Sequence, residues 1–379
     1  MTKKIAIIGG GIVGSTAAYY LTKNKEYSVT LFDEGTGQAT SASAGIISPW
    51  LSQRRNKEWY FLARNGAKFY HDLIQDLEQE GYPTSQVYRQ TGTILYKKNA
   101  KLLDKLYHLA NERLEEAPEI GTISYLSPEE VTQRLPLIHH DQPALFITGG
   151  AKVDGGKLIA TLQKSLAHSP HRLIKKQVTR ISYESEQWLL TTDTQSDAFD
   201  ELVLATGAWL PSLLEPLGFS VDIRPQKGQL IGLNTADDLE DSPVVMPVGE
   251  CDMIPFSHGQ LLIGATHENE QGYDLTPDKE QLQLLKEQAQ TLLPSITDLP
   301  IEHYRVGTRA YTSDFSPFFG EVSELPHLLV ASGLGSSGLT TGPIIGKTLA
   351  DWVEGKTTDF ETYKQQPNRY IDNRLSSDQ

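Results

Sequence analysis

The sequence offers almost nothing from which a disulfide or a cysteine metal site could be built. Its 379 residues include one cysteine, Cys251, and three methionines. One thiol excludes an intrachain disulfide and is too few for a zinc or iron–sulfur site. We therefore expect Cys251 to be a small core residue and expect no metal site.

Positive charge is also scarce. The chain has 34 Lys and Arg residues against 48 Asp and Glu residues, which gives a formal net charge of -14. A field of this sign repels phosphate backbones and anionic lipid, and no basic stripe interleaved with aromatic residues is present. We expect nucleic acid not to be a partner.

Long hydrophobic runs are missing as well. No stretch approaches the roughly 18 apolar residues that read as a membrane span, and the apolar run near the N-terminus is cut by Gly9, Gly10 and Gly11. We expect a cytoplasmic protein without a transmembrane segment. Contact with a membrane surface stays open.

What the chain does contain begins with a βαβ pattern. Residues 4–8 have the pattern of a buried strand, residues 12–22 that of a helix, and residues 27–32 that of a second strand. A right-handed crossover places two such strands side by side in a parallel sheet. The chain therefore starts as a nucleotide-binding fold.

A glycine motif lies between the first strand and the helix. Gly9, Gly11 and Gly14 form G-x-G-x-x-G, which allows a tight turn and a close approach to a pyrophosphate at the helix N-terminus. Asp33 closes the second strand about 20 residues on, as expected for a carboxylate that accepts ribose hydroxyls. Glu34 is the neighbouring candidate, and its alternative is a solvated turn acid. We expect a dinucleotide site here.

Length and pattern together indicate two domains, each built from separate segments. We expect further helices over residues 59–80, 101–116, 158–168, 277–293 (capped by Thr276) and 339–354, and one after the capping box that starts at Ser127. Strands are expected over residues 92–96, 177–182, 202–206, 229–233, 261–266 and 328–332. Those at 177–182 and 202–206 would return to the nucleotide-binding sheet.

The glycine motif alone does not separate NAD from FAD, so the next loop matters. Residues 40–45 are small hydroxyl, alanine and glycine residues that could pass close to a pyrophosphate and a flavin ring. The alternative is a flexible surface loop. The candidate contacts in this loop are Thr40, Ser41, Ser43, Ala44 and Gly45.

Motifs along nearly the whole chain then show a family resemblance. They occupy residues 7–14, 31–33, 43–45, 205–209, 225–229, 307–314, 317–320 and 333–343. In this order they resemble the D-amino-acid oxidase family, which includes glycine oxidase, sarcosine oxidase and bacterial D-amino-acid dehydrogenases. The resemblance implies a non-covalently bound FAD, because Cys251 lies outside any attachment motif.

The resemblance also implies a fold of α/β plus α+β class. A Rossmann-like FAD-binding domain (residues 1–85, 150–222 and 305–379) would carry an inserted substrate domain on a mostly antiparallel sheet (residues 86–149 and 223–304). A homo-oligomer is compatible with the family, whose members range from monomers to tetramers.

For the substrate, the resemblance points to Arg309, whose guanidinium would bind a carboxylate in bidentate fashion. Its alternative is an interdomain salt bridge. Ala310 stands where many relatives have proline. Met253, at a position where glycine oxidases commonly have tyrosine, and Tyr311 are expected to form pocket walls.

For the cofactor, the resemblance adds a second glycine loop before the last helix, whose N-terminal amides would stabilise negative charge on reduced flavin. The alternative for this loop is an ordinary capped helix. Val178 is a further expected contact, and its alternative is a plain strand residue. The further expected contacts are Ile12, Val13, Val178, Thr206, Gly207, Trp209, Gly335, Ser336, Ser337, Gly338, Leu339 and Thr340.

These expectations combine into an FAD-dependent oxidation of a small amino acid, with the α-hydrogen leaving as hydride to flavin N5 and the imine hydrolysing to a keto acid. Oxygen or a quinone would accept the electrons. Three alternatives stay open: an FAD-dependent 2-hydroxy-acid oxidoreductase, a flavin-binding protein without turnover, and a nicotinamide dehydrogenase.

Overall fold

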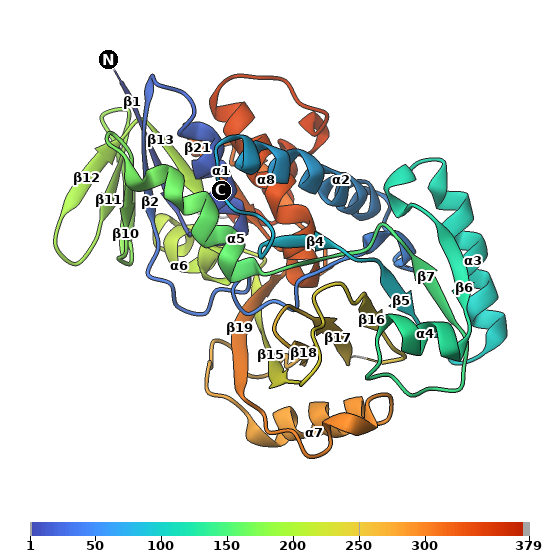
Figure 1. The fold of residues 1–379 in the computed structure, drawn as a ribbon. Helices are drawn as coiled ribbons and strands as arrows, with labels where there is room; N and C mark the ends of the chain where they lie inside the picture. Colours follow the sequence, from blue (N-terminus) through green and yellow to red (C-terminus); the bar gives the residue numbers. More distant parts are fainter. Residues whose placement is uncertain (1, 250, 374–379) are drawn as a thin grey trace. The chain divides into compact units, whose positions relative to one another are not determined.

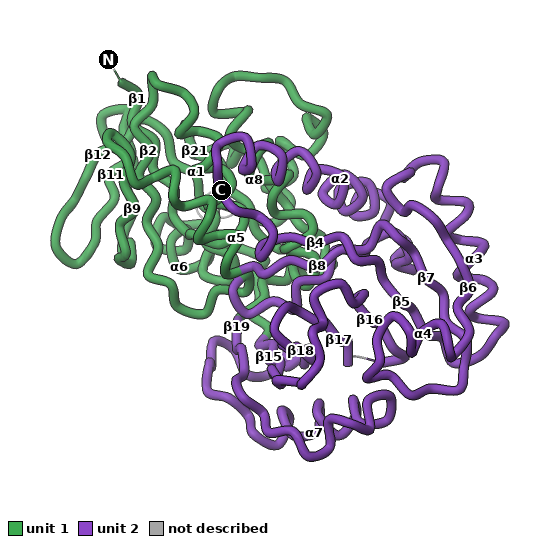
Figure 2. Tube along the Cα trace, in the orientation of Figure 1, with its two compact units in different colours: residues 1–40, 156–226, 308–379 green, residues 41–155, 227–307 purple. Residues whose placement is uncertain are grey.

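The computed structural model describes residues 2–249 and 251–373. The chain divides into two compact units (Figure 2). Unit 1 comprises residues 1–40, 156–226 and 308–379, and unit 2 comprises residues 41–155 and 227–307. Both units are discontinuous, so the chain passes between them four times.

Unit 1 is organised around a six-stranded sheet with the order β20-β21-β13-β1-β2-β9. All neighbouring strands are parallel except β20 and β21. The strands are β1 (Lys3–Ile8), β2 (Tyr27–Phe32), β9 (Arg172–Ile174), β13 (Glu201–Leu204), β20 (Phe318–Glu321) and β21 (Leu328–Ser332). Central apolar strands covered on both faces are typical of a doubly wound nucleotide-binding fold.

Two helices of unit 1 pack closely against each other, α1 (Ile12–Leu21) and α8 (Gly338–Val353), as Figure 1 shows. Glycines make this approach possible. A Cβ atom on Gly346 would lie 2.5 Å from the Val13 carbonyl oxygen, and one on Gly342 would lie 2.4 Å from the Ile12 side chain. The close crossing therefore depends on the absence of side chains at these two positions.

A smaller sheet of unit 1 corrects one prediction. The strand expected at residues 177–182 begins only at Arg180 and does not join the nucleotide-binding sheet. It is β10 (Arg180–Glu184), in an antiparallel sheet with β11 (Gln187–Thr191) and β12 (Ser196–Phe199). The returning strand is β9, which the sequence analysis did not identify.

The rest of unit 1 consists of short elements. The helix expected at residues 158–168 is α5 (Gly155–Leu162), whose first residue belongs to unit 2, followed by a 3₁₀ turn. Also present are α6 (Leu210–Leu214) and the strand pair β14 (Phe219–Val221) and β22 (Ile371–Asn373). The 3₁₀ turns of unit 1 are η3 (Gln163–Ala167), η4 (Gly207–Trp209), η5 (Glu215–Leu217), η7 (Gly335–Ser337), η8 (Glu361–Tyr363) and η9 (Gln366–Arg369).

Unit 2 contains most of an eight-stranded sheet with the order β19-β15-β18-β17-β16-β5-β7-β6. The pairs β15–β18, β18–β17, β17–β16, β5–β7 and β7–β6 are antiparallel, and β16–β5 is parallel. The strands are β5 (Thr93–Leu95), β6 (Ile123–Leu126), β7 (Ala144–Ile147), β15 (Arg224–Asn234), β16 (Val244–Met246), β17 (Asp252–Pro255), β18 (Gln260–Gly264) and β19 (His303–Tyr311). This is the mostly antiparallel sheet expected from the sequence, and the predicted fold class is confirmed.

The helices of unit 2 are α2 (Lys57–Gln79), α3 (Ala100–Leu114), α4 (Pro128–Arg134) and α7 (Lys279–Gln290), with 3₁₀ turns η1 (Pro49–Leu51), η2 (Pro118–Ile120) and η6 (Pro294–Ile296). The capping box predicted at Ser127 is present, because the Ser127 and Glu130 side chains each accept a backbone N–H. The cap predicted for α7 is wrong by two residues. The Asp278 carboxylate, rather than Thr276, accepts the backbone N–H groups of Glu280 and Gln281.

Unit 2 begins earlier than the domain boundary we expected. Residues 41–85, which the sequence analysis assigned to the FAD-binding domain, group with unit 2. The reason is a small antiparallel sheet in which β8 (Ala151–Val153) pairs with both β3 (Ile46–Ile47) and β4 (Tyr88–Gln90). These ladders tie the segment after Thr40 to strands of unit 2.

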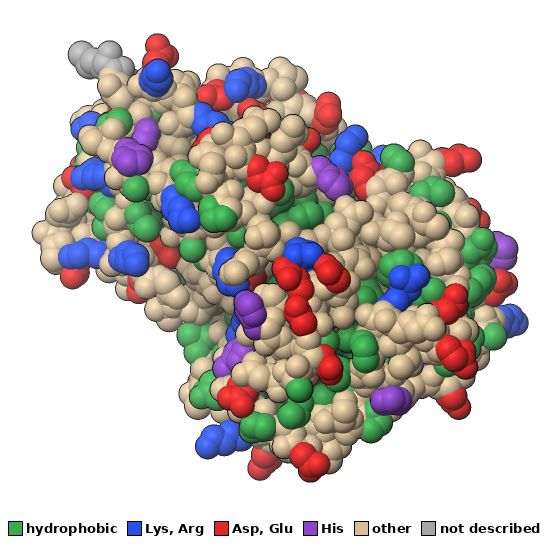
Figure 3. All heavy atoms as spheres, viewed as in Figure 1, with side chains coloured by type: hydrophobic (Ala, Val, Ile, Leu, Met, Phe, Trp, Pro, Cys, Tyr) green, Lys and Arg blue, Asp and Glu red, His purple; other side chains and the backbone are tan. Residues whose placement is uncertain are grey.

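The surface carries both signs of charge. On the face drawn in Figure 3, Lys and Arg side chains lie among Asp and Glu side chains. Across the described residues, no helix combines the length and apolar character that crossing a membrane requires.

Candidate cofactor and substrate site

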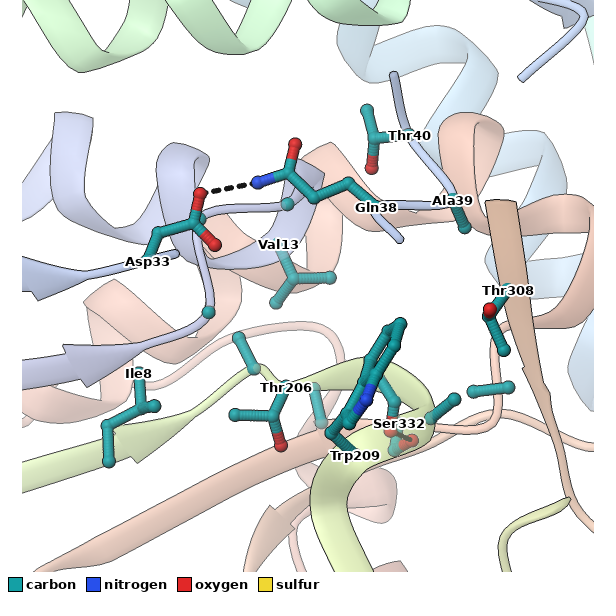
Figure 4. Close-up of a pocket in the computed structure, with 18 of the residues that line it drawn as sticks. Ile8, Val13, Asp33, Gln38, Ala39, Thr40, Thr206, Trp209, Thr308 and Ser332 are labelled. Carbon is teal, nitrogen blue, oxygen red and sulfur yellow. Dashed lines mark hydrogen bonds between the residues drawn. The ribbon is translucent and has the colours of Figure 1, made fainter. Parts of the chain in front are cut away.

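The main pocket of unit 1 lies where the dinucleotide site was expected (Figure 4). Three features meet there: the turn between β1 and α1, the end of β2, and the glycine loop before α8. Ligands of open α/β sheets bind at such carboxyl ends of parallel strands. Of the predicted cofactor contacts, the lining includes Gly9, Gly11, Ile12, Val13, Asp33, Glu34, Thr40, Val178, Thr206, Gly207, Trp209, Gly335 and Gly338.

The first glycine turn has no room for side chains. Gly9 has φ +100°, and a Cβ atom there would lie 2.4 Å from the Ala205 carbonyl oxygen. A Cβ atom on Gly14 would lie 1.9 Å from the Gly9 carbonyl oxygen, so Gly14 serves the packing of turn and helix rather than the pocket lining. The Thr40 hydroxyl accepts the N–H of Ile12 at 3.0 Å and anchors the turn.

Asp33 ends β2 and points toward Gln38, as Figure 4 shows. The Gln38 side-chain amide donates to the Asp33 carboxylate over 2.5 Å. Burial raises the pKa of Asp33, while backbone N–H groups of Gly10 and Gly35 and the Gln38 amide act in the opposite direction. A half-buried carboxylate with such donors can take hydroxyl groups of a ribose.

Two buried hydroxyl groups give an independent test of whether a polar ligand fits. Among the described residues, the Thr206 and Thr308 hydroxyls are buried and have no hydrogen-bond partner, and both threonines line the pocket. Buried polar groups are almost always satisfied, so unpartnered hydroxyls in a pocket indicate a ligand with hydrogen-bonding atoms. The indole of Trp209 stands between Thr206 and Ser332 in Figure 4. The pocket therefore combines polar groups with a flat aromatic surface.

The second glycine loop is shaped around Tyr311. Gly335 has φ +53°, and a Cβ atom there would lie 2.1 Å from the Tyr311 ring. The Tyr311 hydroxyl accepts the backbone N–H of Ser336 at 3.0 Å, directly before α8 begins. The N-terminus of this 16-residue helix carries the positive end of the helix dipole, which stabilises negative charge nearby.

Arg309 lies on β19 between two residues that line the pocket, Thr308 and Ala310. Its side chain is partly buried, and its Nη1 atom donates to the Gln226 side-chain oxygen at 2.9 Å. Ala310 is thus a wall residue of the pocket. A guanidinium in this position is suited to bind a carboxylate.

Several predicted contacts lie outside the pocket lining. Ser336 and Ser337 belong to the loop before α8, and Leu339 and Thr340 are buried in its first turn. Ser41, Ser43, Ala44 and Gly45 belong to unit 2. There the Gly45 carbonyl oxygen accepts the N–H of Val153 at 2.8 Å, which gives Gly45 a structural role. A cofactor contact for each of these residues stays a prediction.

The two predicted pocket walls differ in their surroundings. Tyr311 is buried and packs edge-to-face with Phe315, with ring centroids 5.4 Å apart. Met253 is fully buried in the hydrophobic core of unit 2. Both wall roles stay predictions. Met253 is a core residue, and its adjacent residue on β17, Asp252, points to the other face of the strand.

The pocket also contains residues that the sequence analysis did not single out, among them Gln38, Lys176, Gln177, Ser212, Thr308, Ser332 and Leu334. Gln38 and Thr308 are brought together by a parallel β-bridge between segments 270 residues apart. No local sequence pattern reports such a contact. Thr308, however, lies inside the Gly-x-Arg motif and could have been added.

Comparison with known proteins places these features in a family. The family described as FAD dependent oxidoreductase matches residues 4–352 of the chain. The chain belongs to this family. Its cofactor is FAD, and the glycine turns, the Asp33 carboxylate and the unpartnered hydroxyls of Thr206 and Thr308 fit such a dinucleotide.

Relatives in the FAD-dependent oxidoreductase family resemble the chain over almost its full length. The uncharacterized oxidoreductase YurR of Bacillus subtilis is 36% identical over 96% of this chain and 98% of its own. The crystal structure of iminodiacetate oxidase from Chelativorans sp. BNC1 is 31% identical, with a TM-score of 0.89 over 95% of this chain and 98% of that one. Glycine oxidase from Geobacillus kaustophilus is 26% identical, with a TM-score of 0.81 over 96% and 98%. The predicted family and cofactor are confirmed, and the chain is an FAD-dependent oxidoreductase.

Proposed function

We propose that the chain oxidises the CH–NH bond of a small amino acid that carries a free carboxylate. Glycine, an N-substituted glycine or a small D-amino acid would fit. The product is an imine, which water hydrolyses to ammonia or an amine and a keto acid, or glyoxylate when glycine is the substrate. The single observation that carries this proposal is Arg309 on β19, a strand that reaches the FAD pocket through Thr308 and Ala310 and directs the Arg309 side chain to the other face, which Tyr311 shares.

Arg309 supplies the substrate-binding part of the chemistry. Its planar guanidinium matches a carboxylate in bidentate geometry, which fixes the orientation of the α-carbon as well as its distance from the cofactor. Thr308 and Ala310 place this strand at the pocket wall, and a carboxylate bound to Arg309 would lie on the face of the strand that Tyr311 shares. Orientation of this kind is a large part of catalysis in such reactions.

The chain itself needs no catalytic base for this reaction. When bound, FAD would supply the acceptor for the hydride that leaves the substrate α-carbon. The residues of the chain position the amine and stabilise charge: the N-terminus of α8 offers a positive dipole, and the Tyr311 hydroxyl holds Ser336 in place at that end.

The relatives support the same substrate class. Glycine and iminodiacetate, named for two of the related oxidases, share a carboxylate and a CH–NH bond. We therefore add iminodiacetate to the substrates worth testing. Oxygen or a quinone would be the electron acceptor, and a homo-oligomer is compatible with the proposal.

The proposal is tested by anaerobic titration of the purified holoprotein, following flavin absorbance near 450 nm, the usual flavin band. Glycine, sarcosine, iminodiacetate, D-alanine and D-proline are each compared with their hydroxy analogues. Bleaching by an amine but not by its hydroxy analogue is the expected result. Bleaching by the hydroxy acid alone would replace the proposal with 2-hydroxy-acid oxidation. No bleaching by any compound would contradict it.

The electron acceptor is then assigned under air. Formation of one molecule of hydrogen peroxide for each molecule of amine oxidised identifies an oxidase. A slow reaction with oxygen that a soluble quinone accelerates identifies a dehydrogenase.

A further inference from the structure

The side chain that meets Arg309 is itself a buried polar group. Gln226 lies near the start of β15 and is 6% exposed, and its side-chain oxygen accepts a hydrogen bond from Arg309 Nη1 at 2.9 Å. Strands β15 and β19 are neighbours in the sheet order. Both residues belong to unit 1. The contact therefore links two adjacent strands at the proposed carboxylate site.

The chemistry of this contact favours binding of an anion. An amide oxygen accepts a hydrogen bond from the guanidinium without adding negative charge, so this contact leaves the positive charge of Arg309 intact. A carboxylate at the same place would form an ion pair and compete with the substrate carboxylate. An aliphatic side chain would leave the long arginine side chain with one fewer anchor, and ordering it would then cost binding energy.

We propose that Gln226 is a positioning residue that orients Arg309 for the substrate carboxylate through a neutral hydrogen bond. This inference rests on the proposed function, which assigns the carboxylate to Arg309. In this role Gln226 acts through Arg309 rather than on the substrate. It therefore affects how tightly a carboxylate binds far more than how fast the bound amine is oxidised.

Two substitutions separate the effect of orienting Arg309 from the effect of the charge beside it. Gln226→Leu removes the acceptor and keeps a buried side chain of similar size, whereas Gln226→Glu keeps the shape and adds a carboxylate. The matched control is Gln229→Leu, at a second buried glutamine of the same strand. Gln229 bonds to Glu268 and to the N–H of Asp278, both in unit 2, rather than to Arg309.

Affinity is measured without turnover, by titrating each holoprotein with methoxyacetate and following the change in the flavin spectrum. Methoxyacetate carries a carboxylate and no oxidisable amine. At pH 8 we expect its dissociation constant to rise about 10-fold in Gln226→Leu and about 100-fold in Gln226→Glu, because hydrogen bonds to charged groups are of this strength. The Gln229→Leu control should bind methoxyacetate like the wild type.

The pH profile gives a readout that a purely structural role would not produce. As the pH falls from 8 toward 4, the introduced carboxyl group, whose pKa the adjacent guanidinium lowers, begins to take up a proton and loses its competing charge. The affinity of Gln226→Glu should then approach that of the wild type, whereas the deficit of Gln226→Leu should stay constant. With an amine substrate, KM should rise in both variants while kcat falls by a smaller factor.

The outcomes distinguish this inference from the proposed function. Wild-type affinity for methoxyacetate in both Gln226 variants would overturn the positioning role, and so would equal losses in Gln226→Leu and Gln229→Leu. If Gln226→Leu fails to fold or to retain FAD, the affinity of Gln226→Glu and its pH profile decide whether Gln226 positions Arg309. If no amine bleaches the wild-type flavin, the proposed reaction fails, yet the methoxyacetate series still tests whether Gln226 orients Arg309.

Discussion

Arg309 is the residue on which the proposed substrate class depends. Arg309→Lys keeps the charge and loses the planar fork, and Arg309→Ala loses both. We expect KM for the amine to rise at least about 30-fold in Arg309→Lys and about 100-fold or more in Arg309→Ala, the scale of a lost charge-assisted pair.

FAD should remain bound in both Arg309 variants, because the pocket is lined by the neighbours of Arg309 rather than by its side chain. Steady-state kinetics and the FAD content of the purified variants check this. A variant that turns over at wild-type efficiency would remove Arg309 from the site.

Asp252 gives a residue-scale prediction in unit 2. It lies on β17 two residues before Ile254, so the two share a face of the sheet, where Ile254 packs with Leu230 and Leu262. Burial in this apolar setting raises the pKa of the Asp252 carboxyl to about 7. The folded protein therefore holds a proton on Asp252 at pH values where the unfolded chain has lost it.

Stability should consequently fall as the pH rises from about 4 to about 7, and then level off. Asp252→Asn removes this titration. We expect the variant to exceed the wild type in free energy of unfolding above pH 7, by at most about 4 kcal/mol, with the difference shrinking toward pH 4. Urea unfolding at pH 5 and pH 8 measures it. A difference that is the same at both pH values would contradict the pKa shift.

Asp252 and Met253 also show where sequence reasoning is weakest. We singled out Met253 by resemblance, but neighbouring residues of a strand point to opposite faces. The structure buries Met253 in the core of unit 2 and puts Asp252 on the other face. A shift of one position changes which side chain could meet a ligand, and a single sequence does not fix that register.

At the scale of elements, the start of α8 depends on one glycine. Gly335→Ala would place a methyl group 2.1 Å from the Tyr311 ring at a backbone angle of φ +53°. We expect the loop to shift, with FAD affinity lower by about 10-fold or more and unfolding easier by about 1–3 kcal/mol.

Gly355→Ala is the matched control at the other end of the same helix. Gly355 also has positive φ, +74°, but a Cβ atom there would meet nothing within 4 Å. This variant should lose about 1 kcal/mol of stability and keep its FAD affinity. Equal FAD affinity in the two variants, measured by fluorescence of released flavin, would contradict the role given to Gly335.

Most elements were predictable because their patterns are local. The βαβ start, α2, α3, β21 and α8 follow from periodicity and glycine punctuation, and each lies within a few residues of its expected bounds. The errors have two causes, one non-local and one local. β9 has three residues and is defined by its partner β2, and the true cap of α7 is a neighbouring acid that competes with the threonine we chose.

At the scale of the whole molecule, neither unit is a continuous segment. In the nucleotide-binding sheet, β1 lies between β2 and β13, and β13 pairs in turn with β21. A fragment of residues 1–155 contains only β1 and β2 of that sheet and lacks β15, β17 and β18 of the other.

We therefore expect this fragment not to fold cooperatively, since two strands cannot cover a core of this kind. Circular dichroism and a thermal scan of the fragment, compared with the full chain, check the expectation. A cooperative transition in the fragment would show that the first segment folds without its later partners.

The contact between α1 and α8 has a consequence for which substitutions the chain can tolerate. Gly342 and Gly346 touch the first turn of α1, whose residues Ile12 and Val13 line the FAD pocket, while α8 itself begins at the second glycine loop. The distance between α1 and α8 therefore fixes the spacing between two parts of the cofactor pocket. Residues of the substrate site can be replaced without touching this contact, whereas a methyl group added at Gly342 or Gly346 would push the two helices apart and change the shape of the cofactor pocket.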